Sequence, residues 1–317
     1  MSKLQLATAK ARISELEQKL KIAEASAKKS VKLLEQARSA KPRKPIKRLS
    51  ITKTAKTVVE IIVADVHGAH QDPDAVAAFF KDLEVIRPDR IVLLGDILDA
   101  SGFVNAHDGL WVPDHVESYE DDIKATNMFL DQIDLICPKA EVHYLEGNHE
   151  ARIERWVVKQ KFRHPKDMEF LRRQVSPEHV LHIDKRGYNY IRYLDIQEGF
   201  TVGGWLQLDN LSFCHTPPAA GRNSCSSSLA ITEGNCVFAH THRQDYMPSV
   251  RQLDGSMKAS WNTGCLCKRQ PLWQAQRPTN WTHGYLVRFI DRQRDTFQVV
   301  PMLIYEGRSL GHSIFGK

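Results

Sequence analysis

The 317-residue chain lacks several features that would each point to a well-defined class of protein. It contains no run of 18 or more apolar residues, as a membrane-spanning helix requires. Residues 1–20 carry charges throughout instead of an apolar signal core. No phosphate-binding loop, dinucleotide fingerprint or zinc-protease motif is present, so the use of nucleotide energy is not indicated. We therefore expect a cytoplasmic protein with no membrane partner.

Cysteine is scarce and shows no pattern of a disulfide framework. The six cysteines stand at positions 137, 214, 225, 236, 265 and 267, and none forms a C-x-x-C motif. Cys137, Cys214 and Cys236 lie in or beside apolar segments, which predicts buried, reduced thiols. Cys265 and Cys267 form a C-x-C pair that could bind a metal ion, but no second pair stands at zinc-site spacing. We favour a structural role for this pair in a loop.

Charge is distributed unevenly along the chain. Residues 1–50 contain 14 Lys or Arg and 4 Glu, a balance of +10, whereas the other residues sum to −4. The cationic arm suggests an anionic partner such as nucleic acid. The slightly acidic remainder suits a domain that binds divalent cations.

Residues 1–40 show the spacing of an amphipathic helix. Apolar or small residues recur every seven positions, at 6, 13, 20, 27 and 34 and again three positions on, which is an a/d heptad pattern. Two interpretations remain open: a modestly stable coiled coil that makes a homo-oligomer, which we place slightly ahead, and a lone helix. Pro42 and Pro45 then end the helix, so residues 41–57 are predicted to form a basic linker.

From Val58 the chain alternates strand and helix patterns. Asp72-Pro73 predicts a helix start, a second helix is expected from about Ser118 to Ile136, and residues 100–117 form a loop long enough to be functional. Residues 164–184 are predicted to be helical and irregular, and could roof a site. Short strands follow. We predict an α/β domain over residues 58–307, with two face-to-face mixed β-sheets flanked by helices, and a C-terminal tail over 308–317.

Five segments place metal-binding side chains directly after apolar runs that are typical of buried strands. Because sheets of α/β proteins build their sites at strand ends, these side chains are expected to converge. Any one segment is weak evidence for a metal site, since such residues are common on protein surfaces. The order of all five along the chain is stronger evidence. The segments are Asp65-Val66-His67, Gly95-Asp96-Ile97-Leu98-Asp99, Gly147-Asn148-His149-Glu150, Cys214-His215 and His240-Thr241-His242.

These residue types suit a site for two divalent ions. Such a pair clamps a phosphoryl group and generates hydroxide at neutral pH, and one carboxylate, for which Asp96 is the natural candidate, bridges both ions. Imidazole, carboxylate and amide ligands favour transition metals over Ca or Mg. We expect Mn first, with Fe, Zn or Ni as alternatives.

The five segments together resemble the signature of calcineurin-like metallophosphoesterases. The stretch from about Val58 to Glu306 is similar to the small phosphoesterases encoded by phages and prophages, through Gly147 to Arg152, His240 to Arg243, and a later run from Trp261 to Gly284. The resemblance implies the calcineurin-like sandwich fold and a dinuclear hydrolase of ester bonds.

The resemblance also implies the ligands, residue by residue. Asp65, His67, Asp96 and His242 would hold one ion, and Asp96, Asn148, His215 and His240 the other. His149 matches the family's histidine that binds phosphate and protonates the leaving oxygen. The chain departs from the family where Thr216 and Ala239 replace glycines. Backbone conformations that only glycine tolerates would be excluded there, which could shift Asn148 and His215.

Three further residues are candidates around this site. Asp99 is expected to orient a ligand, with a turn cap as the alternative. Arg152 and Arg243 could hold a substrate phosphate, with a solvated helix face and a loop ion pair, respectively, as the alternatives. The predicted function is hydrolysis of phosphodiesters, in nucleic acid or nucleotides, by a metal-bridging hydroxide with His149 as the acid. Alternatives are a phosphomonoesterase acting on phosphoprotein or nucleotide, and an inactive scaffold acting through the coiled coil.

Overall fold

The computed structural model describes residues 21, 56–100, 118–197, 200–271 and 278–316. The chain divides into two units, Met1–Lys44 and Pro45–Lys317, and every described residue except Lys21 belongs to the second. Apart from residues 21, 56, 57 and 100, the helix predicted for 1–40, the linker 41–57 and the loop 100–117 lie outside the described residues. None of the helices in the described part of the chain combines the length and apolar character needed to cross a bilayer.

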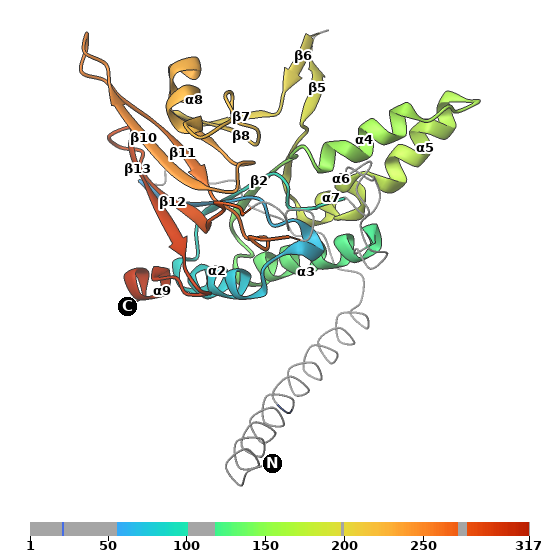
Figure 1. The fold of residues 1–317 in the computed structure, drawn as a ribbon, viewed down its shortest axis with the longest axis horizontal. Coiled ribbons are helices and arrows are strands. Elements are labelled where there is room, and N and C mark those ends of the chain that lie inside the picture. Colours follow the sequence, from blue (N-terminus) through green and yellow to red (C-terminus); the bar gives the residue numbers. More distant parts are fainter. Residues whose placement is uncertain (1–20, 22–55, 101–117, 198–199, 272–277, 317) are drawn as a thin grey trace, which may run out of the picture. The chain divides into compact units, whose positions relative to one another are not determined.

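A six-stranded mixed sheet runs in the order β13-β12-β1-β2-β3-β4 (Figure 1). Strands β1 to β4 are parallel, and β12 and β13 join the edge in antiparallel pairing. Because β1, β2 and β3 are parallel neighbours in register, the loops after them begin at the same edge of the sheet. The strands are β1 (Thr57–Val63), β2 (Arg90–Leu94), β3 (Glu141–Leu145), β4 (Asn189–Ile191), β12 (His283–Asp291) and β13 (Thr296–Ile304).

A five-stranded mixed sheet runs in the order β10-β11-β9-β8-β7. The central strands β8, β9 and β11 are parallel, and β7 and β10 are antiparallel edges. A separate hairpin consists of β5 (Leu194–Gln197) and β6 (Phe200–Gly203). The five strands are β7 (Trp205–Leu208), β8 (Leu211–Cys214), β9 (Cys236–Phe238), β10 (Gln244–Val250) and β11 (Met257–Thr263).

The helices begin where the sequence places capping residues. Asp72 accepts hydrogen bonds from the N–H groups of Asp74 and Ala75, at 3.1 and 3.0 Å, and Ser118 forms a capping box with Asp121. Both predicted helix starts are confirmed. The helical segments are η1 (Gly68–His70), α2 (Pro73–Ile86), α3 (Tyr119–Ile136), α4 (Glu150–Lys159), α5 (Pro165–Val175), α6 (Pro177–Val180), α7 (Ile183–Arg186), α8 (Ser224–Thr232) and α9 (Gly311–Phe315).

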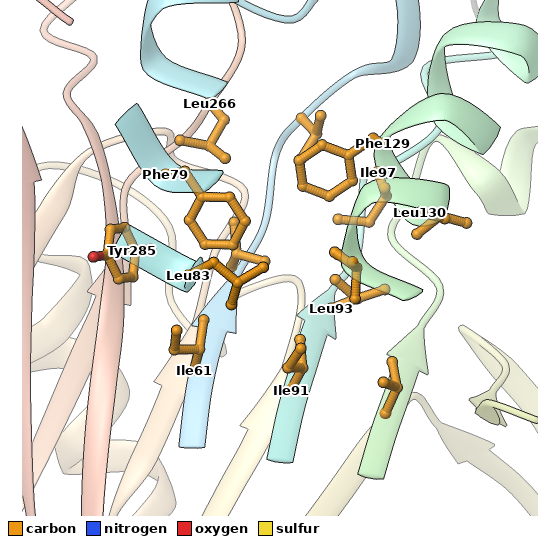
Figure 2. Packing of buried hydrophobic residues seen from close by; sticks show 14 of the residues in the cluster. Ile61, Phe79, Leu83, Ile91, Leu93, Ile97, Phe129, Leu130, Leu266 and Tyr285 are labelled. Carbon is orange, nitrogen blue, oxygen red and sulfur yellow. The ribbon is translucent and has the colours of Figure 1, made fainter. Parts of the chain in front are cut away.

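Two apolar cores define the layers of the fold. Figure 2 shows the first, in which Phe79 of α2 and Phe129 of α3 pack over Ile61 and Ile91 of the six-stranded sheet. The second core lies between the sheets and joins residues of β1 and β2 to residues of β8, β9 and β11, among them Trp261. Successive residues of β1 and β2 belong to the two cores in turn, because neighbouring side chains of a strand point to opposite faces of the sheet. The predicted α/β architecture of two mixed sheets with flanking helices is confirmed.

The segment predicted as a C-terminal tail contains helix α9, which packs on α2. Buried Asp82 of α2 accepts hydrogen bonds from the backbone N–H of His312, at 2.6 Å, and from the hydroxyl of Tyr285, at 2.7 Å. The ring of Phe315 lies 5.7 Å from that of Phe289 on β12. Residues 308–316 are therefore part of the packed domain.

Candidate metal centre

The structure brings all seven predicted ligands to the loops that follow five strands. Two overlapping groups each have their ligand atoms within 4.8 Å of one another: Asp65, His67 and Asp96 in one, and Asp96, His215 and His240 in the other. His242 joins the first group, with its Nε2 3.1 Å from Nε2 of His67. Asn148 joins the second, with its Oδ1 3.2 Å from Nε2 of His215. Asp96 thus stands between the two groups.

The backbone at these loops adopts conformations that non-glycine residues rarely take. Five of the seven have a positive φ, with values of 52° for Asp65, 56° for His67, 50° for Asp96, 69° for His240 and 56° for His242. Such strain costs on the order of 1–3 kcal/mol per residue and persists only where surrounding structure enforces it. Strained residues cluster at functional sites. The clustering here supports a functional role for these loops.

Two glycines allow the loops after β2 and β3 to approach each other. A Cβ on Gly147 would lie 2.1 Å from Oδ1 of Asp96, and a Cβ on Gly95 would lie 2.6 Å from Nδ1 of His215. Neither position has space for a side chain. The glycine before Asp96 and the glycine before Asn148 therefore allow the loops that carry these two residues to lie close together.

Two buried carboxylate oxygens in the cluster have no hydrogen-bond donor. These are Oδ1 of Asp65 and Oδ2 of Asp96, whereas the other oxygen of each carboxylate accepts a backbone N–H, from His240 at 3.0 Å and from His149 at 2.8 Å. Oδ1 of Asp65 lies 3.2 Å from Nε2 of His242, and Oδ2 of Asp96 lies 3.1 Å from Nε2 of His215. Buried charged oxygens without donors are costly unless a cation pairs with them. The residues therefore fit a pair of bound cations.

The histidines present the nitrogen that a cation would need. His215 donates its Nδ1 proton to the carbonyl oxygen of Leu94, at 2.8 Å, and His67 directs Nδ1 to Oδ1 of Asp99, at 2.7 Å. In each ring Nε2 is left facing the cluster. Carboxylate or carbonyl partners on the far nitrogen are the usual arrangement around metal-bound histidines. Asp99, which we expect to orient a ligand, lies at the far nitrogen of His67.

The charges of these carboxylates and histidines shift one another's pKa values. Burial alone would raise the pKa of Asp96, but the charges of His149 and His215 hold it well below its usual range. Burial alone would lower the pKa of His215, but the negative charge of Asp96 raises it to about 9. The Asp96 carboxylate is therefore ionised and attracts positive charge. Because a histidine binds a metal ion only in its neutral form, metal binding would release protons from these histidines.

His149 lies at the more open side of the cluster. Its side chain is 15% exposed, compared with 1% for Asp96 and for His215. Nδ1 of His149 lies 3.0 Å from Oδ1 of Asp99, and its Nε2 lies 3.8 Å from Oδ2 of Asp96. Burial would raise the pKa of Asp99, but hydrogen bonds from His149 and His67 hold it well below its usual range. An ionised Asp99 thus orients His149 with Nε2 toward the cluster.

The two predicted phosphate-binding arginines differ in their surroundings. Nη1 of Arg152 lies 3.0 Å from Nδ1 of His149, which places its guanidinium beside the cluster. Arg243 instead donates from Nη2 to the carbonyl oxygen of Arg222, at 2.6 Å, and lies 3.5 Å from Oδ2 of Asp245. This is the loop ion pair that was the alternative for Arg243. We therefore retain Arg152 alone as a candidate for substrate phosphate.

The two departures from the family glycines cause no backbone strain. Neither Thr216 nor Ala239 has a positive φ. The N–H of Ala239 donates to the carbonyl oxygen of His215, at 2.9 Å, and the Thr216 hydroxyl lies 3.2 Å from that of Tyr193. Both side chains are accommodated, and His215 still faces Asn148.

Glu150 has a role that the sequence pattern did not reveal, although it ends the third segment. Its fully buried carboxylate accepts hydrogen bonds from the N–H groups of the loops that carry Asp96 and Asn148 and from one hydroxyl. The donors are Asp96 N at 3.0 Å, Ile97 N at 2.9 Å, Leu98 N at 3.1 Å, Gly147 N at 2.9 Å and Tyr144 Oη at 2.8 Å. Burial and the charge of Asp96 raise the pKa of Glu150, and the N–H of Leu98 opposes that shift. Glu150 therefore holds the two ligand-bearing loops together.

Glu150→Gln is expected to destabilise the protein and to weaken metal binding. Glutamine has one acceptor oxygen, so its NH₂ group must face backbone N–H donors in either orientation, and each orphaned N–H costs about 1–3 kcal/mol. We expect a loss of about 3 kcal/mol in urea unfolding. Glu154→Gln, one turn further along α4 with a 41% exposed side chain, is the matched control and should change stability by less than about 0.5 kcal/mol. Equal stability of the two variants would contradict the anchoring role.

Two residues behind His242 were also not assigned to the site from the sequence. The Cys267 thiol lies 3.7 Å from Nδ1 of His242, and the ring of Trp281 packs edge to face on it with centroids 4.0 Å apart. All six cysteines are free and buried, as predicted for Cys137, Cys214 and Cys236. Cys267 and Trp281 thus pack against the imidazole of His242 and restrict its orientation.

A sandwich of two mixed sheets, with buried histidines and aspartates at its strand ends, defines a class of metal-binding α/β proteins. The family model for calcineurin-like phosphoesterases matches residues 61–270, and the chain belongs to this family. Its members are metal-dependent phosphoesterases, and the seven candidate ligands lie within the matched region.

Two solved structures are similar to this chain at low sequence identity. One is vacuolar protein sorting 29 from Cryptosporidium parvum, with 10% identity, a TM-score of 0.40, and coverage of 80% of this chain and 95% of that one. The other is Vps29 from Chaetomium thermophilum, with 9% identity, a TM-score of 0.35, and coverage of 80% and 90%. No curated protein sequence matches the chain.

Proposed function

We propose that this chain is a phosphoesterase that binds two divalent transition-metal ions and cleaves phosphodiesters. The observation that carries the proposal is the pair of buried, donor-free oxygens, Oδ1 of Asp65 and Oδ2 of Asp96, that face imidazole nitrogens. A cluster that served only to stabilise the fold would pair these oxygens with donors. The family assignment supplies the phosphate-ester chemistry.

The two groups of ligands divide between two ions. Asp65, His67 and His242 would hold one, and Asn148, His215 and His240 the other, while Asp96 would contact both. Two such ions, when bound, neutralise charge on the phosphate and lower the pKa of water so that it attacks phosphorus at neutral pH. A set of imidazole, carboxylate and amide ligands suits Mn, Fe, Zn or Ni, of which we propose Mn first.

The residues beside the ligands complete the reaction. As the bond between phosphorus and the leaving oxygen breaks, His149 donates its Nε2 proton to that oxygen. Oδ1 of Asp99 lies 3.0 Å from Nδ1 of the same ring and so holds the ring with Nε2 toward the cluster. Arg152, whose Nη1 is 3.0 Å from Nδ1 of His149, is placed to bind a non-bridging oxygen of the phosphate.

Phosphodiesters are the preferred substrate class in this proposal. The basic residues beside the cluster continue along α4, where Arg155 and Lys159 are exposed. Only a substrate that extends beyond the scissile phosphate reaches them. A phosphomonoester on a protein or nucleotide is the alternative, and it would use the cluster and Arg152 alone.

A metal-loading experiment with two matched substrates tests this function. We expect the Mn-loaded protein to contain two equivalents of metal by elemental analysis and to hydrolyse a chromogenic phosphodiester faster than the monoester of the same phenol. Faster hydrolysis of the monoester would replace the diester assignment with the alternative. Absence of bound metal after Mn loading would contradict the proposal that this chain is a metal-dependent phosphoesterase.

A further inference from the structure

Helix α4 carries a row of basic residues that starts at the candidate metal centre. Arg152, Arg155 and Lys159 are separated by three and four positions, so they share one face of the helix. Arg152 contacts His149 at the start of the row, and Arg155 and Lys159 are exposed. At a rise of 1.5 Å per residue the row extends about 10 Å from Arg152 to Lys159. We call these three residues the α4 basic row.

The two acidic residues of α4 interact with groups other than the α4 basic row. Glu150 is buried among the backbone N–H groups of the ligand loops, and Glu154 lies 3.5 Å from Nη1 of Arg172 on α5. Within the ranges that the structure describes, no carboxylate lies at ion-pair distance from any member of the α4 basic row. The arginines of α5 differ, because Arg172 and Arg173 both pair with Glu169, each at 2.9 Å. The positive charges of the α4 basic row are thus not neutralised by a described carboxylate, unlike those of Arg172 and Arg173.

The row is held in place and continues past the end of the helix. The Arg155 guanidinium lies over the ring of Tyr193, 5.4 Å from its centroid, which restricts its motion without neutralising its charge. Beyond Lys159, Lys161 and Arg163 in the turn to α5 and Lys166 in the first turn of α5 are exposed. Figure 1 shows α4 and α5 side by side, with this turn at their far end from the sheets. Positive charge therefore runs from the cluster to the end of the helix pair.

A ligand that matches this row is a chain of regularly spaced anions. Each strand of a nucleic acid carries one phosphate per ~3.4 Å along a duplex axis, so a row about 10 Å long meets two to three of them. A single phosphate group, as in a small monoester, would leave Arg155 and Lys159 without a contact. We infer that the α4 basic row binds the backbone phosphates of a nucleic acid strand whose scissile phosphate lies at the metal centre. The position of the scissile phosphate rests on the proposed function, whereas the binding by α4 does not.

Binding of an oligonucleotide to the metal-free, full-length protein tests this inference without any hydrolysis. The variant Arg155→Gln/Lys159→Gln removes two charges at exposed positions, and Lys81→Gln/Arg308→Gln removes two exposed charges from α2 and the segment before α9 as the matched control. All three proteins retain residues 1–50, so any contribution of that basic segment cancels in the comparison. Fluorescence anisotropy with a labelled single strand is recorded from 50 to 200 mM salt.

We expect the α4 variant to lose affinity on the order of 10-fold and its salt slope to fall by about 1.4, because each phosphate contact to a single strand contributes ~0.7. The control should match the parent protein. The same affinity and slope in the α4 variant as in the control would overturn the inference. A polyglutamate of equal charge provides a second test. If it binds the parent protein as tightly as the oligonucleotide and loses as much affinity in the α4 variant, the inference is overturned, because the row would then recognise negative charge and not nucleic acid. Failure of the Mn-dependent diesterase assay would count against the proposed function and leave this binding result unaffected.

Discussion

Asp96→Asn is expected to lower kcat/KM of the Mn-loaded protein by more than about 10²-fold. Replacing a residue that merely orients a metal ligand already lowers metal affinity or activity about 10- to 100-fold. Asp96 is the one residue whose carboxylate belongs to both groups of ligands. Asparagine keeps an oxygen that can accept the N–H of His149, now 2.8 Å from Oδ1, so the loop should keep its conformation. It removes the negative charge that Oδ2 presents to the cluster. Elemental analysis should therefore show less than two metal equivalents.

Asp82→Asn is the matched control for this substitution. Asp82 is also a fully buried carboxylate, but it bonds to Tyr285 and to the backbone of His312 instead of facing the cluster. Its replacement should lower stability and leave the metal content at two equivalents. A metal content that falls equally in both variants would mean that loss of any buried carboxylate disturbs the fold. Full activity of Asp96→Asn would contradict the bridging role directly.

The sequence predicted those parts of the fold in which a local signal agrees with the tertiary structure. The apolar runs before Asp65, Asp96 and Asn148 are β1, β2 and β3, and the caps Asp72 and Ser118 begin α2 and α3. Such runs and caps act through neighbouring residues, so they can be recognised without knowledge of the rest of the chain. The same property made the ligand segments recognisable, because each is a short stretch at a strand end.

Other elements depend on contacts that are distant in sequence. Helix α8 has the sequence SCSSSLAIT, in which serine is a weak helix former, and it is held by buried Cys225 and Leu229 over the second sheet. The role of Glu150 was equally hidden, because its donors at residues 96–98 are more than 50 positions away. Arg243 could be assigned to its ion pair only once Asp245 and the Arg222 carbonyl were placed beside it. Local patterns thus find the ligands, whereas the residues that hold them require the fold.

His149→Ala is expected to retain both metal equivalents but to lose kcat on the order of 10²-fold or more with a substrate whose leaving group is a poor one. His149 supplies none of the seven ligands, and its Nε2 lies 3.8 Å from Oδ2 of Asp96 at the open side of the cluster. Removing the ring therefore leaves the ligand sets complete. The alkoxide of a poor leaving group needs a proton as it departs, and no proton donor would remain at this position.

The dependence on the leaving group separates a proton donor from a phosphate-binding residue. With an activated phenol as the leaving group, the loss in His149→Ala should be much smaller, because a stable phenolate departs without protonation. His179→Ala, which removes an exposed histidine of α6, is the control and should behave as the parent protein with both substrates. An equal loss with good and poor leaving groups would show that His149 binds the phosphate in ground and transition states alike. Asp99 would then serve to position His67 and His149 around the metal centre, and the proton for the leaving oxygen would come from another group.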